Sequence, residues 1–117
     1  MFYPEGQLRV FLYGKPADMR KSYDGLSALT KSVLGEDPLS GNLFVFINRR
    51  RNQIKVLYFD RSGYCVWSKR LERGRFASSA DGIKHPLNLT QLKLLLEGIE
   101  LKNIRQKKRF SLDERRV

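Results

Sequence analysis

Apolar side chains recur along this chain with two different periods, and each period indicates a different kind of element. Val10 and Leu12 alternate with Arg9, Phe11 and Tyr13, which predicts a short strand over residues 8–13. Spacings of three and four residues then predict a helix over residues 22–34. The side chains expected on the inner face of this helix are Tyr23, Leu26, Leu29, Thr30 and Val33.

The two ends of this predicted helix carry typical signals. Ser22 is placed to cap the N-terminus, and Asp24 lies in the first turn, where a carboxylate is favourable. Gly35 suits the left-handed position that ends many helices. Gly25 is unexpected, because glycine inside a helix costs about 1 kcal/mol relative to alanine. We therefore expect another group to approach the helix closely at Gly25.

Three further strands are predicted in the middle of the chain. The segment at residues 43–48 is apolar on both faces, which is typical of a central strand covered on each side. Residues 53–60 and 64–71 follow as two more strands, joined by a turn in which Gly63 suits the left-handed position. These segments predict a three-stranded antiparallel meander, which the strand at residues 8–13 is expected to join.

The second half of the chain predicts one more helix and a tail. Residues 73–86 are expected to form a polar connection, followed by a helix that begins near Thr90. Residues 102–117 hold few apolar side chains and are expected to be a flexible basic tail. The predicted fold is therefore a single α+β domain over residues 1–101, with an antiparallel sheet of about four strands and two helices.

Charge is the most unusual property of the composition. The 117 residues include 23 lysines and arginines against 12 acids, which gives a net charge of +11. The excess is concentrated in residues 49–76 and in residues 102–117, whereas the rest of the chain is close to neutral. Such a concentration indicates a polyanionic partner, either nucleic acid or an anionic membrane surface.

The strand pattern places the cations of residues 49–76 at the ends of the meander. A phosphate backbone could cross them there, and such contacts give affinity without reading sequence. The side chains expected to contact DNA are Arg49, Arg50, Arg51, Lys69, Arg70, Arg73 and Arg75. Tyr64 and Trp67 could stack on unpaired bases, but we interpret both as core residues.

A second group of charges, around residues 18–25, is expected to behave differently. Arg20 and Lys21 lie beside Asp18 and Asp24, so their charge is largely balanced within the segment. We expect this pair of cations to be structural or to contact a protein partner.

The remaining chemistry is sparse. Cys65 is the one cysteine, which rules out a disulfide within the chain, and its context predicts a small buried residue. There is no signal-peptide pattern, and no apolar stretch approaches the roughly 18 residues of a membrane span. We expect a cytoplasmic protein, associated with the nucleoid if it binds DNA, with neither a membrane nor a small molecule as a partner.

Metal-dependent nuclease activity is the enzymatic alternative. It requires several carboxylates that converge on the metal ions. The candidates are Asp18, Asp24, Asp60, Glu72 and Asp81. Nothing in their spacing forces them together, and His85 is the single histidine. No zinc-ligand set and no phosphate-binding loop is present in the sequence, so we expect no cofactor and no metal.

Three stretches now resemble one protein family. They are "DMRKSYDGL" at residues 18–26, "GNLFVFINRRRNQIKVLYFD" at residues 41–60 and "KRLERGRF" at residues 69–76. Their order and spacing, over about residues 5–101, are similar to the TnpB-type accessory protein of the bacterial insertion-sequence family numbered sixty-six. This family is unrelated to the RNA-guided nuclease that shares the TnpB label.

The resemblance implies a helper in transposition that is encoded beside a larger transposase carrying the acidic catalytic residues. No catalytic residue transfers to this chain. The positions that match the family motifs are Asp18, Met19, Arg20, Lys21, Asp24, Gly25, Leu26, Arg49, Arg50, Lys69, Arg70, Leu71, Glu72, Gly74, Arg75 and Phe76. The chain departs from the family pattern at Ser22, where glycine is usual, and after Phe76, where "ASS" replaces an aromatic residue and proline.

Residues and resemblance together predict a non-enzymatic accessory factor for transposition that binds DNA, at the element's ends or non-specifically, through a basic β-hairpin. The element's transposase is the other expected partner. Two alternatives remain open: a protein–protein adaptor that binds the transposase, and the metal-dependent nuclease.

Overall fold

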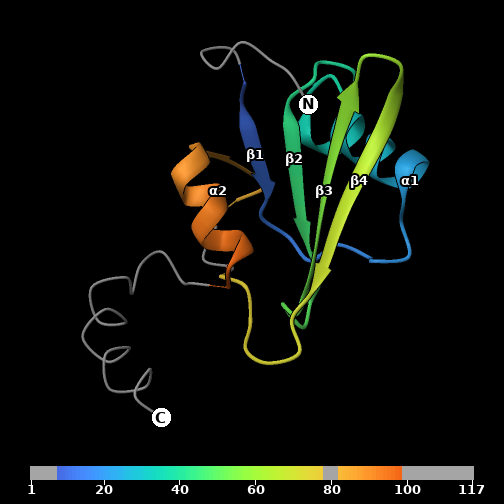
Figure 1. Cartoon of the computed structure of the whole chain (residues 1–117). Helices are drawn as coiled ribbons and strands as arrows, with labels where there is room; N and C mark the ends of the chain where they lie inside the picture. Colours follow the sequence, from blue (N-terminus) through green and yellow to red (C-terminus); the bar gives the residue numbers. More distant parts are fainter. Residues whose placement is uncertain (1–7, 78–81, 99–117) are drawn as a thin grey trace.

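Five strands form one sheet in the computed structural model, which describes residues 8–77 and 82–98 (Figure 1). The strands are β1 (Val10–Tyr13), β2 (Leu43–Ile47), β3 (Gln53–Asp60), β4 (Gly63–Arg70) and β5 (Lys84–Leu87). Their order across the sheet is β4-β3-β2-β1-β5. β1 and β2 run parallel, and the other neighbouring strands are antiparallel. The expected α+β class and the β2-β3-β4 meander are confirmed, but the sheet is mixed and has five strands, where an antiparallel sheet of about four was expected.

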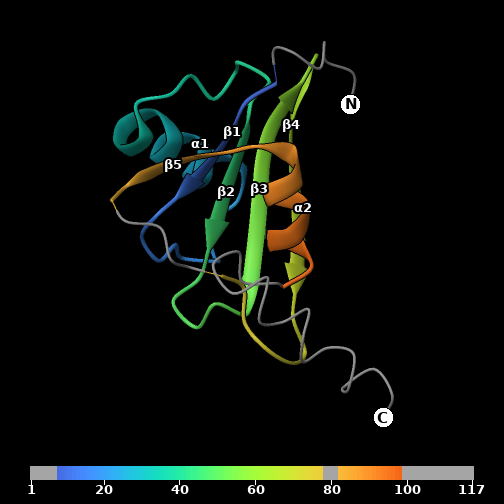
Figure 2. The ribbon, with the colours of Figure 1, turned by 90° about the vertical axis from the view of Figure 1, so that its left-hand side faces the viewer.

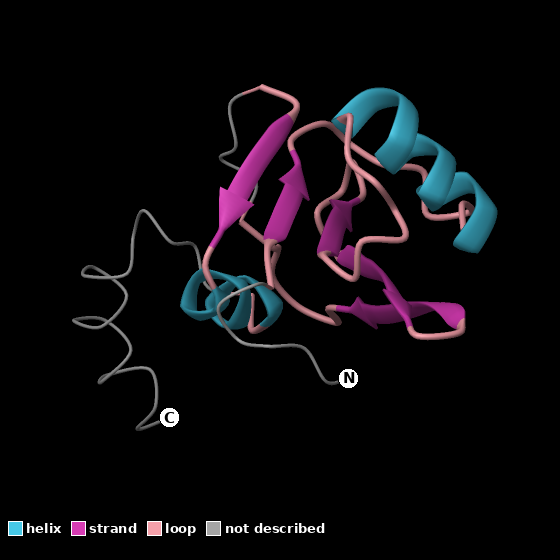
Figure 3. Ribbon diagram, turned by 90° about the horizontal axis from the view of Figure 1, so that it is seen from above, coloured by secondary structure: helices cyan, strands magenta, loops and turns pink. Residues whose placement is uncertain are grey.

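Helices cover both faces of this sheet. α1 (Tyr23–Leu29) continues directly into η2 (Thr30–Leu34), a π-helical segment, and α2 (Leu89–Leu96) follows β5. Figures 2 and 3 show α1 on one side of the strands and α2 on the other. The core is accordingly divided by the sheet into two clusters of buried side chains.

β2 separates the two clusters and is buried along its whole length, as its continuous apolar pattern predicts. Val45 packs with Leu92 and Leu95 on the α2 side of the sheet. Phe44 packs with Leu26 of α1 on the other side. Since both faces of β2 are covered, a polar side chain at any position of this strand would be buried and would destabilise the fold.

The helix over residues 22–34 is confirmed, but its inner face is not the expected one. The buried side chains are Leu26, Thr30 and Leu34. Tyr23 and Val33, expected in the core, are 50% and 41% exposed. The wider π-helical turn after Thr30 adds a residue to the last turn, so Leu34 instead of Val33 points inward.

The helix ends also differ in part from the sequence signals. The Ser22 side chain makes no capping hydrogen bond, so this predicted cap is wrong. Gly35 has a φ of +66° and ends the helix in the left-handed conformation, as expected. A Cβ atom at Gly25 would lie 3.0 Å from the Cβ atom of Lys21. The close approach expected at this glycine is therefore present.

The segment expected to be a polar connection contains a strand and a core residue. Residues 84–87 form β5, which pairs antiparallel with β1. Pro86 obscured this strand in the sequence, yet proline is tolerated there because β5 lies at the sheet edge. Phe76 is fully buried and packs in the α2-side cluster. In the β3–β4 turn, Arg61 takes the left-handed conformation with a φ of +53°, not Gly63.

α2 begins at Leu89, one residue before the expected start. Its N-terminus is closed by a capping box, in which Asn88 and Gln91 each accept a hydrogen bond from the other's backbone N–H. Leu92 and Leu95 enter the core. The expected tail at residues 102–117 lies outside the described residues.

Lys55 ties the segment around residues 18–21 to the sheet. Its ammonium donates hydrogen bonds to the backbone oxygens of Met19 and Lys21, both at 2.8 Å. The backbone N–H of Ala17 also donates to the oxygen of Ile47, at 2.8 Å, where β2 ends. The turn that precedes α1 is therefore fixed against the end of the sheet by one side chain and one backbone contact.

Replacing Lys55 with methionine should destabilise the fold by about 2 kcal/mol, because two carbonyl groups lose a charged donor. Urea unfolding followed by circular dichroism measures this change. Lys31→Met, at an exposed position on η2, is the matched control and should change stability by less than about 0.5 kcal/mol. Equal stability of the two variants would show that the Lys55 contacts contribute nothing.

Candidate nucleic-acid interface

The turn between β2 and β3 presents three consecutive arginines, and its backbone is fixed by Asn48. The Oδ1 atom of Asn48 accepts hydrogen bonds from the backbone N–H groups of Asn52 and Gln53, both at 3.0 Å. Its Nδ2 atom donates to Oδ1 of Asn52 at 2.7 Å. Arg51 has a φ of +58° and donates its N–H to the oxygen of Asn48 at 3.0 Å. The turn is therefore held in one shape before it meets any ligand.

The segment after β4 runs back beside this turn. Leu71 donates its backbone N–H to the oxygen of Asn52, and Phe76 donates to the oxygen of Arg51, both at 2.7 Å. The buried Phe76 ring anchors the end of the segment, and Gly74 supplies the reversal with a φ of +79°. Residues 72–75 consequently project from the same end of the sheet as the β2–β3 turn, the lower end in Figure 1.

These two segments bring five of the expected cations together. We call the exposed side chains Arg49, Arg50, Arg70, Arg73 and Arg75 the arginine cluster. Arg49, Arg50 and Arg75 line one polar hollow of about 300 Å³. Glu72, the acid in this hollow, lies 3.5 Å from Arg70, and both side chains are largely exposed. Such an exposed pair contributes little energy, so most of the positive charge faces solvent.

Arg51 and Lys69, the other two cations expected to contact DNA, lie in different surroundings. The Lys69 ammonium donates to the backbone oxygen of Leu96 at 2.8 Å. A cation there stabilises the C-terminal end of α2, which gives Lys69 a structural role. Arg51 is half-buried, and its backbone joins the turn to the segment after β4.

The segment around residues 18–21 lies at the same end of the sheet, through the contact of Ala17 with Ile47. There Arg20 holds Asp18 in a two-pronged ion pair, with a shortest distance of 2.7 Å between Nη2 and Oδ2. The backbone N–H of Arg20 also donates to Oδ1 of Asp18 at 2.9 Å. The Arg20 hydrogen bonds lower the pKa of the Asp18 carboxyl to about 2. Arg20 is thus balanced locally, as its neighbours in the sequence predicted.

The aromatic side chains of β4 are less buried than expected. Trp67 is 44% exposed, so its interpretation as a core residue is wrong. Tyr64 is half-buried, with its ring 5.3 Å from the Phe59 ring in an edge-to-face arrangement, and Cys65 is also half-buried. These side chains are less buried because β4 lies at the edge of the sheet. The sequence predicted that this segment is a strand, but it did not predict the order of the strands.

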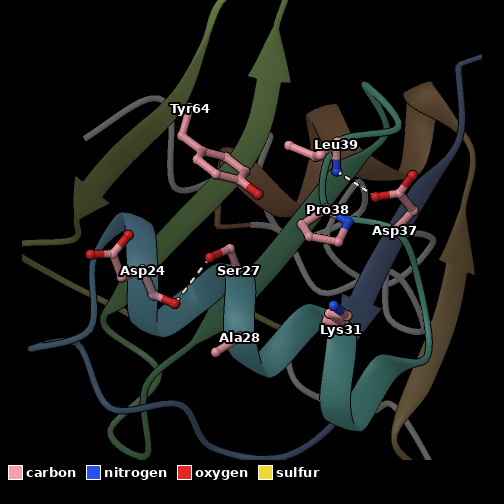
Figure 4. A pocket seen from close by; sticks show the side chains of 8 residues that line it. All are labelled: Asp24, Ser27, Ala28, Lys31, Asp37, Pro38, Leu39 and Tyr64. Carbon is pink, nitrogen blue, oxygen red and sulfur yellow. Dashed lines mark hydrogen bonds between the residues drawn. The ribbon is translucent and has the colours of Figure 1, made fainter.

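A second hollow, of about 520 Å³, lies on the opposite side of the sheet from α2 (Figure 4). Its walls come from α1 and η2, from residues 37–39 and from Tyr64. Two acids, Asp24 and Asp37, lie at its rim, and the Oδ1 atom of Asp37 accepts from the N–H of Leu39 at 2.9 Å. Leu39 is 55% exposed. This hollow combines apolar walls with two carboxylates and the ammonium group of Lys31, unlike the one beside the arginine cluster.

Among the described residues, the acids considered for a metal site are not brought together. Within the described part of the chain, no three His, Cys, Asp or Glu side chains form a group that could hold a metal ion. Asp81 lies outside the described residues. No helix among residues 8–77 and 82–98 is long and apolar enough to cross a membrane.

Sequence reasoning found the arginines but missed the residues that position them. Asn48, Asn52 and Lys55 determine the shape of this end of the molecule. A signal was present, since asparagine stands on both sides of the three arginines in "NRRRN". Asparagine side chains bond to nearby backbone groups in turns.

Comparisons with known proteins agree with the motif spacing. The model of a family described as IS66 Orf2-like proteins matches residues 8–106. Uncharacterized protein y4hO of Sinorhizobium fredii (strain NBRC 101917 / NGR234) is 41% identical over 99 residues, covering 83% of this chain and 86% of the relative. Uncharacterized protein y4jC of the same strain is 33% identical over 109 residues, covering 92% of each chain. No solved structure matches this chain.

The family model spans most of the chain, including both arginine-bearing segments and the segment around residues 18–21. The chain therefore belongs to the IS66 Orf2-like family of TnpB-type accessory proteins, which are associated with transposition.

Proposed function

We propose that the arginine cluster binds the phosphate backbone of DNA and that the protein assists transposition without catalysing a reaction itself. One observation carries this proposal. Two segments far apart in the sequence are joined by the hydrogen bonds of Leu71 and Phe76, and together they expose five arginines at one end of the sheet. A general basic surface would not need this construction.

The chemistry of the cluster fits phosphate better than it fits a protein carboxylate. Guanidinium groups form forked hydrogen bonds with phosphate oxygens and remain charged at all physiological pH values. The backbone beneath Arg49 and Arg50 is already fixed by Asn48, so binding there orders few additional groups. Contacts to phosphate position a protein on the duplex without reading its sequence. The cluster is accordingly proposed as a general DNA contact.

The adaptor role is the second candidate, and the hollow beside α1 favours it. Leu39 and Tyr23 are at least half exposed on that side of the molecule. An apolar, weakly acidic surface would suit a protein such as the element's transposase better than DNA. Because the hollow and the arginine cluster involve different residues, the two roles can be separated by mutation.

A nuclease role receives less support from the geometry. Asp18 is held by Arg20, Asp24 lies at the rim of the hollow beside α1, and Glu72 lies beside Arg70. Phosphoryl transfer with two metal ions needs carboxylates that converge on one point. Incubating the protein with supercoiled plasmid and Mg²⁺ or Mn²⁺ tests this alternative, and nicked or linear product would support it.

Replacing Arg73 and Arg75 with alanine should weaken DNA binding equally for unrelated sequences. Each lost phosphate contact should reduce the slope of log K against log salt by about 0.9, so the double variant should lose about 1.8. The measurement is a fluorescence anisotropy titration with two duplexes over a range of salt concentrations, without transposase. Circular dichroism confirms that the variant is folded.

The matched control removes the same charge elsewhere. Lys31→Ala combined with Arg61→Asn changes two exposed cations outside the cluster, and asparagine tolerates the left-handed conformation of Arg61. This control should retain its affinity to within about twofold, since distant exposed charges are screened by salt. An equal loss in both variants would show that net charge, not the cluster, governs binding.

A second pair of substitutions separates the two motifs at this end of the sheet. Arg20→Ala combined with Lys21→Ala should cost less DNA affinity than the Arg73 and Arg75 pair, because the Arg20 guanidinium is already bonded to Asp18. The same titration at two salt concentrations measures both variants. If the Arg20 and Lys21 variant stays folded yet binds more weakly, the DNA surface is centred on the segment before α1.

A further inference from the structure

The two edges of the sheet differ in a way that the proposed DNA contact does not explain. β5, at one edge, spans Lys84–Leu87 and contains Pro86, which has no N–H group to offer another strand. Short length, proline and lysine are the usual means of blocking an edge. β4, at the other edge, spans Gly63–Arg70 and contains no proline. Within the described chain, β4 pairs with one strand, β3.

The direction of the hydrogen bonds along β4 follows from one contact. The N–H of Leu71 donates to the oxygen of Asn52, which continues the β3–β4 ladder, so the odd-numbered residues of β4 face β3. Successive residues of a strand direct their backbone groups to opposite sides. The residues that direct their backbone N–H and C=O groups toward the open edge are therefore Tyr64, Val66, Ser68 and Arg70.

We propose that this edge pairs with β4 of a second copy of the chain, antiparallel and centred on Trp67, to give a dimer with a continuous sheet. In this register Tyr64 lies opposite Arg70 of the partner, and Val66 lies opposite Ser68. Every outward-facing residue of β4 thus finds an outward-facing partner within the strand. Centring the pair on Val66 would instead place Arg70 opposite the turn residue Ser62, so fewer ladder hydrogen bonds would form.

The side chains of β4 are self-complementary in the same register. Lys69 would lie opposite Cys65 and Arg70 opposite Tyr64, so no like charges face each other across the interface. Opposed like charges destabilise a strand pair, whereas aromatic pairs stabilise it. The two Trp67 side chains, each 44% exposed in the single chain, would meet on the axis. A partner strand from another protein would have no reason to match this pattern.

This dimer does not depend on DNA binding. Four members of the arginine cluster, Arg49, Arg50, Arg73 and Arg75, lie outside β4, in the β2–β3 turn and in the segment after β4, so strand pairing leaves them accessible. Arg70, the last residue of β4, is the one member that also lies on the pairing edge. A chain that dimerises but does not bind DNA would refute the proposed function alone. A chain that binds DNA as a monomer would refute the dimer alone.

The first test is the mass of the full-length protein without DNA, measured by sedimentation equilibrium. We expect twice the single-chain mass of 13.7 kDa at micromolar concentration. Trp67→Lys places two like charges on the axis and should raise the dimer dissociation constant at least about tenfold. Ile83→Lys is the matched control, because Ile83 is also 44% exposed and lies beside β5. This control should leave the dimer unchanged.

The second test addresses the register and does not require the Trp67→Lys variant to fold. In a Cys65→Ser background, Trp67→Cys should form a disulfide-linked dimer on mild oxidation, since facing residues of a non-hydrogen-bonded pair have Cα atoms about 4.5 Å apart. Ser68→Cys in the same background should not, because the two copies of that position would be about 8 Å apart.

Three results would overturn the proposal. A monomer at all accessible concentrations would do so, including one whose β4 pairs only with a strand of another protein. A Trp67→Lys variant that dimerises as tightly as the wild type would place the interface elsewhere. Cross-linking through position 68 with the same or greater yield than through position 67 would show that the register is wrong.

Discussion

Complete burial of β2 is the constraint on which the rest of this structure depends. A strand that is covered on both faces needs an apolar side chain at every position and a helical layer on each side. Phe44 and Phe46 are fully buried against the α1 side, and Val45 is fully buried against the α2 side. Burial of each such side chain contributes about 1.5–3 kcal/mol. The end of β2 is therefore firmly positioned in the sheet.

The arginine cluster is built directly on that point. Asn48 follows the last residue of β2, and its side chain closes the turn that carries Arg49 and Arg50. Like charges repel one another, so exposed arginines would separate if only their side chains held them together. Here backbone hydrogen bonds and the buried Phe76 hold the two segments, and the guanidinium groups remain available to a partner. The scaffold offsets the repulsion without neutralising the charge.

Charged groups differ in their roles within this molecule, and so do the two edges of the sheet. Arg20 and Lys69 are engaged with Asp18 and with the end of α2, so these cations support the fold. One edge of the sheet is blocked by Pro86, whereas the other presents a long strand with an exposed indole. An unblocked edge is a liability for an isolated sheet. The open edge of β4 is consistent with the proposed pairing with a second copy of the chain.

The sequence by itself determined the local elements, because their periodicities are short-range properties. The bounds of β3, the apolar character of β2 and the turn at Gly35 were all predicted correctly. The order and spacing of three motifs indicated the family whose model matches residues 8–106, and the concentration of cations in residues 49–76 predicted a polyanionic partner. These features depend on neighbouring residues, which a single sequence displays.

Only the tertiary structure decided which segments meet and which side chains remain exposed. The order of the strands places Trp67 at an edge, although its alternating context is the same as that of a buried residue. β5 is a strand because β1 offers it a partner, since its four residues around Pro86 have weak strand propensity of their own. Lys69 differs from Arg70 because its side chain reaches the end of α2, which lies 27 positions away in the chain. Such long-range contacts depend on how the whole chain packs, and local sequence patterns do not predict them.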